Sequence, residues 1–468
     1  MNNKKLVQFI NDFWDKEAIP ALQDFIKIPN KSPEFDSNWE TNGYMDQAER
    51  CISAWCKINS PKGMQIKTLK TPGRTPIILI DIPGEINKNI LFYGHLDKQP
   101  EMSGWDDDLG PYTPVIKDGK LYGRGSGDDG YAVFSAISSI LAIQKQNLKH
   151  PNIQIMIEAS EESGSIDLPF YINKYEKDII KPDMFICLDS GCGDYDRMWL
   201  TTSLRGMATG ILEVEVLTEG VHSGMAGGIA PSALEIMQHQ LQKISTPLQA
   251  RINLPELKVN IPKARLQQIK EAAAILGENV AKDFPFAATT QALSDNNTDL
   301  ITQQTWLNSY AIIGLDGIPS TDDAGNVHIP KLTAKISLRL APTCDANKAI
   351  ESIKQKLELN PPYSATIKFS PITINNGWHA NIASEELSTT FDTASLNYFG
   401  EKCAYMGEGG SIPFINMLQE KFPSSEFIIT GVLGPQSNAH GPNEFLHIAT
   451  VKKISCCIAE IVHNFYKN

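Results

Sequence analysis

The stretch that decides the fold runs from residue 131 to residue 160, YAVFSAISSILAIQKQNL (131–148) followed by KHPNIQIMIEAS (149–160). The first part repeats apolar residues at helical spacing and the second is apolar on both faces, which indicates a helix followed by a buried strand. Similar strand-like runs lie on either side, PIILIDIP (76–83) and NILFYGH (89–95) before it and DMFICLDS (183–190) after it. Strands of this kind alternating with helices predict an α/β fold with a mainly parallel sheet covered by helices.

A second pattern occupies the middle of the chain. Half-buried alternation in GILEVEVLTEG (210–220) and KLTAKISLRLA (331–341) predicts strands with one open face. Two further strand-like runs are SYAIIGLDG (309–317) and SATIKFSPI (364–372), and helices are expected near 231–244 and at 346–358. The order is then β-α-β-β-α-β, with a helical and polar insertion at about 245–307. A chain of 468 residues is also long enough for two domains. The expected domains are a discontinuous catalytic domain of residues 1–203 and 381–468, and an inserted α+β lid and dimerisation domain of residues 204–380.

The composition limits the classes of partner. The chain has 54 Asp and Glu against 42 Lys and Arg, a formal net charge of −12 at pH 7, and no basic tract. This balance weighs against a nucleic acid or an anionic membrane as the main partner. No run reaches the roughly 18 consecutive apolar residues of a membrane span, and the opening MNNKKLVQFINDFWDKEAIP lacks the apolar core of a signal peptide. The eight cysteines include no CxxC pair, so we expect reduced thiols in a cytoplasmic protein.

Acidic residues and histidines recur at one structural place, at or near the end of an apolar run. In open α/β sheets, ligand sites lie beyond the carboxyl ends of the strands, so these side chains should converge at one edge of the sheet. They are His95 and Asp97 in LFYGHLD, Asp128 and Asp129 in YGRGSGDDG, Glu161 and Glu162 in EASEESG, Asp189 in FICLDS, and His440 after FIITGVLG.

Several like charges at one edge repel one another unless cations offset them, so the pattern predicts a metal site. Imidazole nitrogens with carboxylate oxygens and no thiolate are typical of zinc, with manganese or cobalt as substitutes. Two histidines and at least three carboxylates exceed the needs of one tetrahedral ion and suit a pair of ions about 3.5–4 Å apart with a shared carboxylate. Asp128 is the candidate bridge, because it opens the helix expected near Gly130 and an anion is favoured at a helix N-terminus.

Five ordered motifs carry a family resemblance. GHLDKQP, LYGRGSGDDG, EASEESGS, CLDS and NAHGPNEF follow one another as in the co-catalytic zinc amidohydrolases, which include carnosinase, cytosolic dipeptidase, aminoacylase, glutamate carboxypeptidase and succinyl-diaminopimelate desuccinylase. The resemblance extends from about residue 20 to the end of the chain. Further agreement around DGKLYGRGS, VHSGMAGG, ISLRLAP and EGGSIP makes the sequence most similar to the carnosinase-type dipeptidases.

The resemblance implies a ligand set for two zinc ions. His95, Asp128 and Asp189 would hold one ion, and Asp128, Glu162 and His440 would hold the other.

The resemblance also implies catalytic roles beside the metals. Glu161 would be the general base that takes a proton from a metal-bridging water and passes it to the leaving amine. Asp97 would orient the His95 imidazole. Relatives have a cis peptide at the bridging aspartate, so a cis bond is expected between Asp128 and Asp129.

The inserted domain should contribute to the site as well. In relatives, the histidine that corresponds to His222 crosses a dimer interface into the partner's active site and polarises the substrate carbonyl, so the resemblance implies a homodimer. Arg339 would clamp a carboxylate with its guanidinium group. The loop Gly409, Gly410 and Ser411 would complete that pocket. These features imply a peptide-like substrate with a free C-terminal carboxylate.

Two positions depart from the family pattern. Gly130 stands where relatives usually have a lysine, and Gly407 stands where they usually have an arginine. The first change alters the local charge of the loop after Asp128 but removes no metal ligand. The second suggests a substrate preference different from that of a typical carnosinase.

The sequence therefore predicts a dinuclear zinc metallopeptidase that hydrolyses the amide bond of a dipeptide or similar small substrate. An alternative with the same chemistry is an N-acyl amino acid deacylase or desuccinylase. An alternative of another class is a catalytically inactive, metal-dependent binding module. Glu161 argues against that module, because a binding site does not need a base beside a metal ligand.

Overall fold

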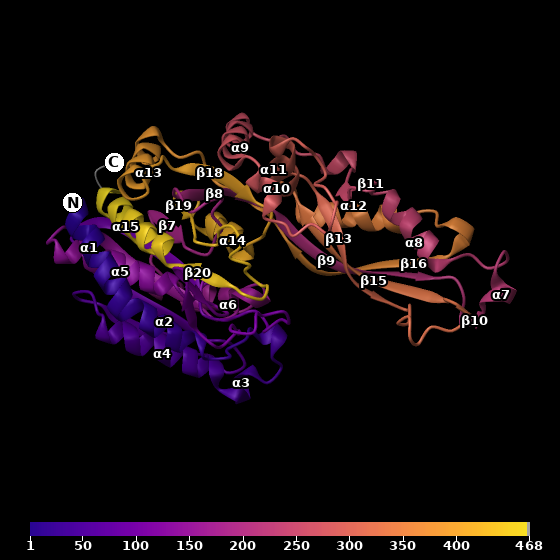
Figure 1. The fold of residues 1–468 in the computed structure, drawn as a ribbon, viewed down its shortest axis with the longest axis horizontal. Coiled ribbons are helices and arrows are strands. Elements are labelled where there is room, and N and C mark those ends of the chain that lie inside the picture. Colours follow the sequence, from indigo (N-terminus) through magenta and orange to yellow (C-terminus); the bar gives the residue numbers. More distant parts are fainter. Residues whose placement is uncertain (466–468) are drawn as a thin grey trace. The chain divides into compact units, whose positions relative to one another are not determined.

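The computed structural model describes residues 1–465, which divide into two compact units (Figure 1). The first unit contains Met1–Thr201, Ala380–Met406 and residues 417–465, and the second contains Thr202–His379 and Gly407–Asn416. The chain therefore passes between units within two residues of the positions expected from the sequence. Residues 407–416 differ from the expectation, because they group with the second unit although the sequence analysis assigns them to the first domain.

The first unit is built on a six-stranded sheet whose centre is parallel. β6, β3, β7 and β19 run parallel, and β2 and β1 add antiparallel pairs at one edge. Every residue of β7 is buried, as are the last six of β3, so both faces of the sheet are covered at its centre. The expected mainly parallel sheet is confirmed. In spatial order the strands are β1 (Gln65–Leu69), β2 (Ile77–Ile82), β6 (Pro151–Glu158), β3 (Ile86–His95), β7 (Met184–Cys187) and β19 (Glu426–Ile429).

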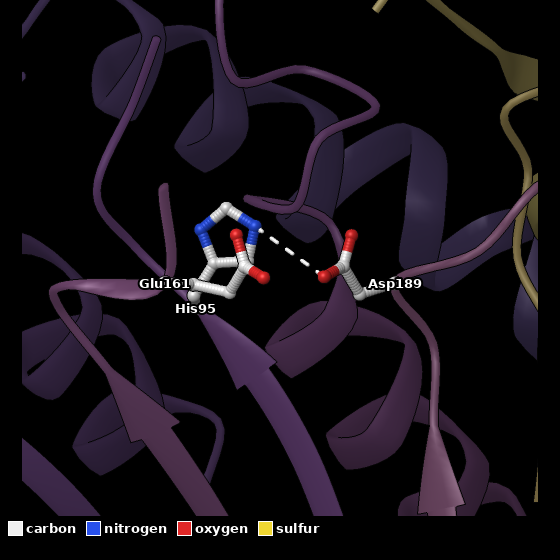
Figure 2. A group of neighbouring side chains, drawn as sticks. All are labelled: His95, Glu161 and Asp189. Carbon is white, nitrogen blue, oxygen red and sulfur yellow. Dashed lines mark ion pairs between the residues drawn. The ribbon is translucent and has the colours of Figure 1, made fainter. Parts of the chain in front are cut away.

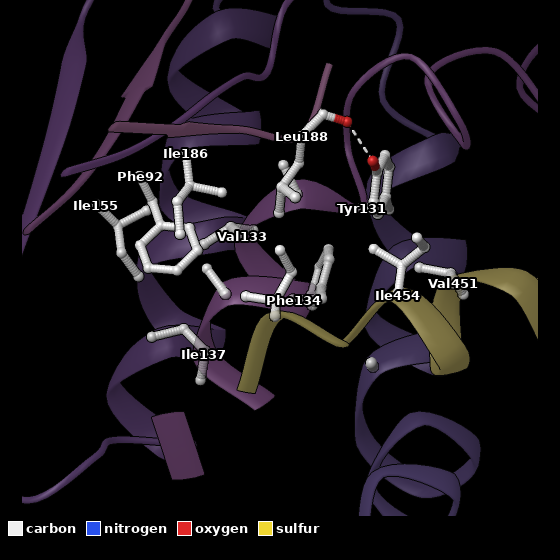
Figure 3. Close-up of a cluster of buried hydrophobic side chains, with 14 of the residues drawn as sticks. Phe92, Tyr131, Val133, Phe134, Ile137, Ile155, Ile186, Leu188, Val451 and Ile454 are labelled. Atoms are coloured by element: carbon white, nitrogen blue, oxygen red, sulfur yellow. Dashed lines mark hydrogen bonds between the residues drawn. The ribbon is translucent and has the colours of Figure 1, made fainter. Parts of the chain in front are cut away.

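Three helices pack together on this sheet. α5 (Ala132–Lys145) contacts β3, β6 and α15 (Ile448–Asn464), and α1 (Asn3–Phe13) contacts both helices (Figure 1). α5 is buried on nearly all sides because it lies between the sheet and the outer helices. Its contacts with the strands form the core shown in Figure 3, which draws Phe92, Tyr131, Val133, Phe134, Ile137, Ile155, Ile186, Leu188, Val451 and Ile454.

The other elements of the first unit surround this core. The helices are α2 (Ile19–Ile26), α3 (Trp39–Asn42), α4 (Tyr44–Ile58), α6 (Leu168–Lys174) and α13 (Glu385–Tyr398), with a π-helical turn η1 (Trp14–Ala18) and 3₁₀ turns η2 (Pro33–Phe35), η3 (Glu161–Ser163) and η4 (Glu176–Asp178). A small antiparallel sheet contains β20 (Phe445–His447), β5 (Lys120–Tyr122) and β4 (Val115–Lys117). The chain crosses between the units within β8 (Trp199–Leu204), β18 (Ala404–Glu408) and α14 (Pro413–Lys421).

The second unit has an antiparallel sheet covered on one face. Even-numbered residues of β15, such as Leu332 and Ile336, are buried beneath α8 and α12, and the odd-numbered residues are partly or fully exposed on the other face. The expected β-α-β-β-α-β order is confirmed as β9-α8-β13-β15-α12-β16. In spatial order the strands are β11 (Ser245–Thr246), β12 (Arg251–Ile252), β13 (Ser309–Asp316), β15 (Lys331–Leu340), β9 (Gly206–Glu215) and β16 (Thr366–Asn375), and the two helices are α8 (Ala233–Gln242) and α12 (Ala346–Glu358).

The remaining elements of the second unit are short or belong to the insertion. The insertion contributes α9 (Lys263–Leu276), α10 (Asn279–Lys282), α11 (Asn297–Trp306) and the turn η5 (Pro255–Leu257); elsewhere lie α7 (Ser223–Ala226), the paired strands β10 (Val221–His222) and β14 (Val327–His328), β17 (Trp378–His379) and the turn η6 (Pro362–Ser364). Within residues 1–465, no helix combines the length and apolar character needed to cross a membrane.

Candidate active site

Three neighbouring parallel strands of the first unit end side by side. β3 ends at His95, β6 ends at Glu158 and leads into η3 at Glu161, and β7 ends two residues before Asp189. His95 and Glu158 are direct partners in the β3–β6 register. Because parallel strands present their carboxyl ends at the same edge, the polar side chains that follow them meet there.

His95 lies between two of these carboxylates. Its Nε2 atom is 3.1 Å from Asp128 Oδ1 and 3.7 Å from Asp189 Oδ2. Figure 2 shows His95 next to Glu161, with Asp189 facing His95 from the end of the neighbouring strand. The His95 side chain is fully buried. The structure therefore brings together the three residues expected to share one ion, His95, Asp128 and Asp189.

His440 faces the other oxygen of Asp128. The Nε2 atom of His440 is 3.0 Å from Asp128 Oδ2 and 3.4 Å from Glu162 Oε2. Each carboxylate oxygen of Asp128 thus faces a different imidazole, which is the arrangement that a bridging carboxylate requires. The side chain of His440 is 55% exposed whereas that of Glu162 is 3% exposed, so His440 forms the solvent side of the cluster.

Glu161 lies on the His95 side of the cluster. His95, Glu161 and Asp189 each offer a ligand atom, and these atoms lie within 4.8 Å of one another; a second group within the same limit is His95, Asp128 and Glu162. Glu161 is therefore as close to His95 and Asp189 as a metal ligand would be, although the sequence analysis assigns it the role of base.

The electrostatics of the cluster favour bound cations. Burial, together with the charge of Asp189, raises the pKa of Glu161 well above its ordinary value, and burial with the charge of Asp128 does the same for Glu162. Although burial opposes it, hydrogen bonds with His440 and His95 hold the pKa of Asp128 well below its usual range. Glu162 Oε1 is buried and has no hydrogen-bond partner among the described residues. Imidazole and carboxylate donors around an unpartnered carboxylate oxygen fit divalent metal ions.

Asp97 fixes the backbone that carries the two glutamates. Its carboxylate accepts hydrogen bonds from the backbone N–H groups of Glu161, at 3.1 Å, and Glu162, at 3.0 Å. Asp97 Oδ1 is also 3.4 Å from His95 Nδ1, although the backbone oxygen of Asp97 is closer to that nitrogen, at 3.1 Å. Asp97 therefore orients both the imidazole and the glutamate pair.

The residues expected to bind a carboxylate form one cluster in the second unit. Arg339 Nη1 donates a hydrogen bond to Ser411 Oγ at 3.1 Å, and Ser411 Oγ donates to the backbone oxygen of Arg205. Arg205 in turn donates from Nε to the Gly409 oxygen at 3.0 Å and from its backbone N–H to the Gly410 oxygen. The sequence analysis missed Arg205, which lies five residues before the strand expected at 210–220 and just before the observed β9 (Gly206–Glu215).

His222 lies away from this cluster. It ends β10 and is exposed, and its Nδ1 accepts a hydrogen bond from the Gly224 N–H at 3.1 Å. β10 pairs with β14, which lies beside the Lys331 end of β15, whereas Arg339 lies at the other end of that strand. Lys331 and Arg339 are eight residues apart, about 26 Å at roughly 3.3 Å per residue. Within a single chain, the second unit therefore does not bring His222 and Arg339 together.

Comparison with known proteins places these features in a family. The model of peptidase family M20/M25/M40 matches residues 91–464. The chain belongs to this peptidase family. It is 25% identical over 398 residues to the cysteinylglycine-S-conjugate dipeptidase of Corynebacterium striatum, covering 81% of each chain. It is 25% identical over 448 residues to the Beta-Ala-His dipeptidase of Rattus norvegicus, covering 89% of this chain and 86% of the relative. The solved structure of the di-peptidase Dug1p from Saccharomyces cerevisiae shares the fold, with a TM-score of 0.79, 22% identity and coverage of 100% and 99%.

Two buried glycines explain why this member of the M20 family departs from the usual pattern. A Cβ atom added to Gly130 would lie 2.4 Å from the Gly125 backbone oxygen and 2.6 Å from the Phe25 ring. A Cβ atom added to Gly407 would lie 2.4 Å from Ser203 Oγ and 3.1 Å from Thr305. Neither site has room for a lysine or an arginine, so the surrounding packing requires glycine at both. The peptide bond between Asp128 and Asp129 is cis, as the family resemblance implies.

Three polar residues that hold the candidate ligands, or the loops that carry them, were missed in the sequence. Gln99 Nε2 donates to Glu162 Oε2 at 2.5 Å. Glu158 accepts hydrogen bonds from the Tyr93, Ser160 and Ser165 hydroxyls. Glu444 pairs with Arg124 at 2.6 Å and accepts from the backbone N–H groups of Gly125, Gly127 and Asp128. All three residues lie inside the motifs GHLDKQP, EASEESGS and NAHGPNEF, which was the available signal.

Proposed function

We propose that this M20 peptidase is a dinuclear metallodipeptidase that hydrolyses the amide bond of small substrates with a free C-terminal carboxylate. The observation that carries the proposal is the position of Asp128, whose two oxygens face His95 and His440 at 3.1 and 3.0 Å. The names of the two relatives, a cysteinylglycine-S-conjugate dipeptidase and a Beta-Ala-His dipeptidase, support a dipeptide as the substrate.

The proposed ligands are those expected from the sequence. His95, Asp128 and Asp189 would hold one ion, and Asp128, Glu162 and His440 the other, and the nitrogen and oxygen donors favour zinc, with manganese or cobalt as substitutes. When bound, the ions would supply positive charge that polarises the scissile carbonyl and makes the attacking water more acidic.

Proton transfer in this proposal depends on Glu161. Its carboxylate takes a proton from the attacking water and later gives it to the nitrogen of the leaving amine. The hydrogen bond from the Glu161 N–H to Asp97 holds the residue at the sheet edge, and burial with the charge of Asp189 raises the pKa of its carboxylate, which makes it a better proton acceptor. Arg339, Ser411 and the backbone of Gly409 and Gly410 would bind the substrate carboxylate.

A homodimer would complete the site. Because His222 and Arg339 lie at opposite ends of β15 in one chain, His222 can act on a substrate held by Arg339 only from a second copy. Exposed apolar side chains near His222 support such an interface, since Met225 is 75% exposed and Ile229 is 85% exposed. A cytoplasmic location also belongs to the proposal, supported by eight free cysteines, of which all but Cys51 are buried.

The test combines a substrate panel with one variant. Zinc-loaded protein should release amine from dipeptides such as Ala-Gly and much less from N-acetyl or N-succinyl amino acids. The reverse preference would identify the deacylase alternative. Glu161→Ala should bind the same amount of metal but lose about 10²–10⁴-fold in kcat, the range typical of a general base. Unchanged kcat in that variant would contradict the mechanism, and metal binding without any hydrolysis in the unaltered protein would indicate a binding module.

A further inference from the structure

The second unit contains a cavity that has no role in the reaction proposed above. Its volume is about 520 Å³, a size suited to a small molecule. The insertion between α8 and β13 supplies an apolar wall, which includes Val280, Ala281, Phe284, Phe286, Leu293 and Leu300. Phe284 is 52% exposed and Phe286 is 43% exposed, so a ligand there would cover large apolar side chains that are open to solvent.

The cavity is also positively charged. Arg205 and Arg251 line it, and none of the lining residues that the structure describes is acidic. Within residues 1–465, no side-chain hydrogen bond or ion pair is formed by the Arg251 guanidinium, and Arg205 bonds only to neutral oxygens. Burial and the charge of Arg339 lower the pKa of Arg205 to about 10. A ligand with an anionic group would therefore provide the negative charge that these two arginines lack.

The strand register connects this cavity to the carboxylate cluster. Arg251 of β12 pairs with Ser309 of β13, and Ser309 pairs with Arg339 of β15. Directly opposed residues in antiparallel strands place their side chains on the same face, about 5 Å apart for each pair. Arg251, Ser309 and Arg339 thus form a row on the face of the sheet that α8 and α12 leave open. Arg205 belongs to both sites, because it lines the cavity and bonds to Ser309 Oγ, at 2.9 Å, and to Gly409.

We propose that the cavity is the subsite for the side chain of the substrate's C-terminal residue, and that Arg251 selects side chains with an apolar stem and a terminal anion. This inference rests on the proposed function, because it takes Arg339 and Ser411 to bind the α-carboxylate of the same residue. The apolar stem covers the wall formed by Phe284 and Phe286, and the terminal anion pairs with Arg251. A purely apolar side chain leaves the Arg251 guanidinium without a counter-ion, and a terminal cation is repelled.

Three free amino acids of similar chain length test the terminal group directly. 2-Aminoadipate, norleucine and lysine end in a carboxylate, a methyl group and an ammonium group, and their binding to the metal-loaded protein is measured by titration calorimetry. The expected order of affinity is 2-aminoadipate, norleucine, lysine. Arg251→Gln should weaken 2-aminoadipate about tenfold to a hundredfold, the effect of losing a charged hydrogen bond, and leave norleucine unchanged. Arg251→Lys should retain most of the preference.

Lys335→Gln is the matched control. Lys335 lies on the same strand and the same sheet face as Arg339 but does not line the cavity, so its loss should not change the order of affinity. Equal affinities for the three amino acids, or equal effects of Arg251→Gln and Lys335→Gln, would overturn the proposal. Unchanged thermal unfolding of Arg251→Gln shows that the variant is folded.

Hydrolysis separates failure of the subsite from failure of the enzyme. With the unaltered protein, Ala-Glu should have a higher kcat/KM than Ala-Met, and Ala-Lys the lowest, and 2-aminoadipate should compete with the substrate. Hydrolysis without this preference would leave the dipeptidase standing and overturn the subsite. Arg251-dependent binding of 2-aminoadipate that does not inhibit hydrolysis of Ala-Ala would overturn the subsite in favour of a separate effector site. Arg251-dependent binding without hydrolysis of any peptide would instead overturn the proposed function.

Discussion

Glu161 and Glu162 are adjacent in sequence but their carboxylates have different neighbours in the cluster of candidate metal ligands. Glu162 faces His440 at 3.4 Å and accepts a hydrogen bond from Gln99, whereas Glu161 lies beside His95 and Asp189. Both backbone N–H groups donate to the one carboxylate of Asp97, so the turn that separates the two side chains is fixed. This geometry permits one glutamate to hold a cation while its neighbour transfers a proton.

Replacement by alanine should affect protein stability unequally at two nearby glycines. Gly407→Ala should destabilise the protein by about 1–3 kcal/mol, because the new Cβ atom overlaps Ser203 Oγ and presses on Thr305. Gly410→Ala should leave stability within about 0.5 kcal/mol, because nothing lies within 4 Å of its Cβ position. Thermal unfolding of both variants provides the comparison, and an equal loss in the two would contradict the packing explanation.

At the scale of elements, Lys98 joins the strand end that carries His95 to the end of helix α2. Its side chain is fully buried, and Nζ donates to the backbone oxygens of Phe25, Ile26 and Ile28 at 2.9, 3.2 and 2.8 Å. The Phe25 and Ile26 carbonyls lie at the end of α2 and the Ile28 carbonyl lies two residues beyond it, in the region where a helix leaves carbonyl oxygens without partners inside the helix. Lys98 therefore satisfies the helix C-terminus and holds it against the segment that follows β3.

Replacement of this lysine should be costly. Lys98→Met keeps the length and removes the donor, so it should destabilise the protein by roughly 2 kcal/mol or more, at about 1–3 kcal/mol for each of the Ile26 and Ile28 carbonyls left unpaired. The Phe25 oxygen is not counted, because it keeps the Ile28 N–H as a donor. Lys27→Met is the control, because Lys27 is 58% exposed and its ion pair with Asp24 lies at the surface. A melting temperature lowered equally by both changes would show that Lys98 does not stabilise the helix end.

At the scale of the whole molecule, the buried carboxylates couple metal binding to pH. The pKa values of Glu161 and Glu162 are raised in the metal-free fold, so the folded state binds more protons than the unfolded chain between the ordinary and the raised values. The metal-free protein should therefore lose stability as pH rises through that interval. Metal replaces those protons, so the rise in melting temperature caused by zinc should grow from pH 5.5 to pH 8. A rise that is the same at every pH would contradict this coupling.

Subunit exchange tests the origin of His222. His222→Ala and Glu161→Ala should each be inactive alone. If the partner supplies His222, a mixed dimer contains one site with an intact Glu161 and an intact His222, so mixing the two variants should restore part of the activity. A sizing measurement accompanies the assay to establish the dimer. Mixtures that remain inactive despite exchange of subunits would show that His222 acts within its own chain or not at all.

The sequence by itself determined the parallel sheet, the inserted β-α-β-β-α-β unit and the candidate ligands His95, Asp128, Glu162 and Asp189. The sheet and the inserted unit could be predicted because strand and helix periodicity is local, and the acidic residues and histidines because they recur near strand ends, which meet at one edge of a parallel sheet. His440 was predictable for the same reason, since it follows the last strand of that sheet. Which of these residues are ligands was implied by the family resemblance.

The contacts that support the site, and the residues that come together at the cavity, could be known only from the tertiary structure. Glu444 reaches the Asp128 loop across more than three hundred residues of sequence, and the Arg251–Ser309–Arg339 row depends on the register of three strands. The need for glycine at 407 arises from Ser203 and Thr305, which are far from it in the chain. Contacts of this kind join side chains that are far apart in the sequence, so local periodicity does not reveal them and they form only once the chain has packed.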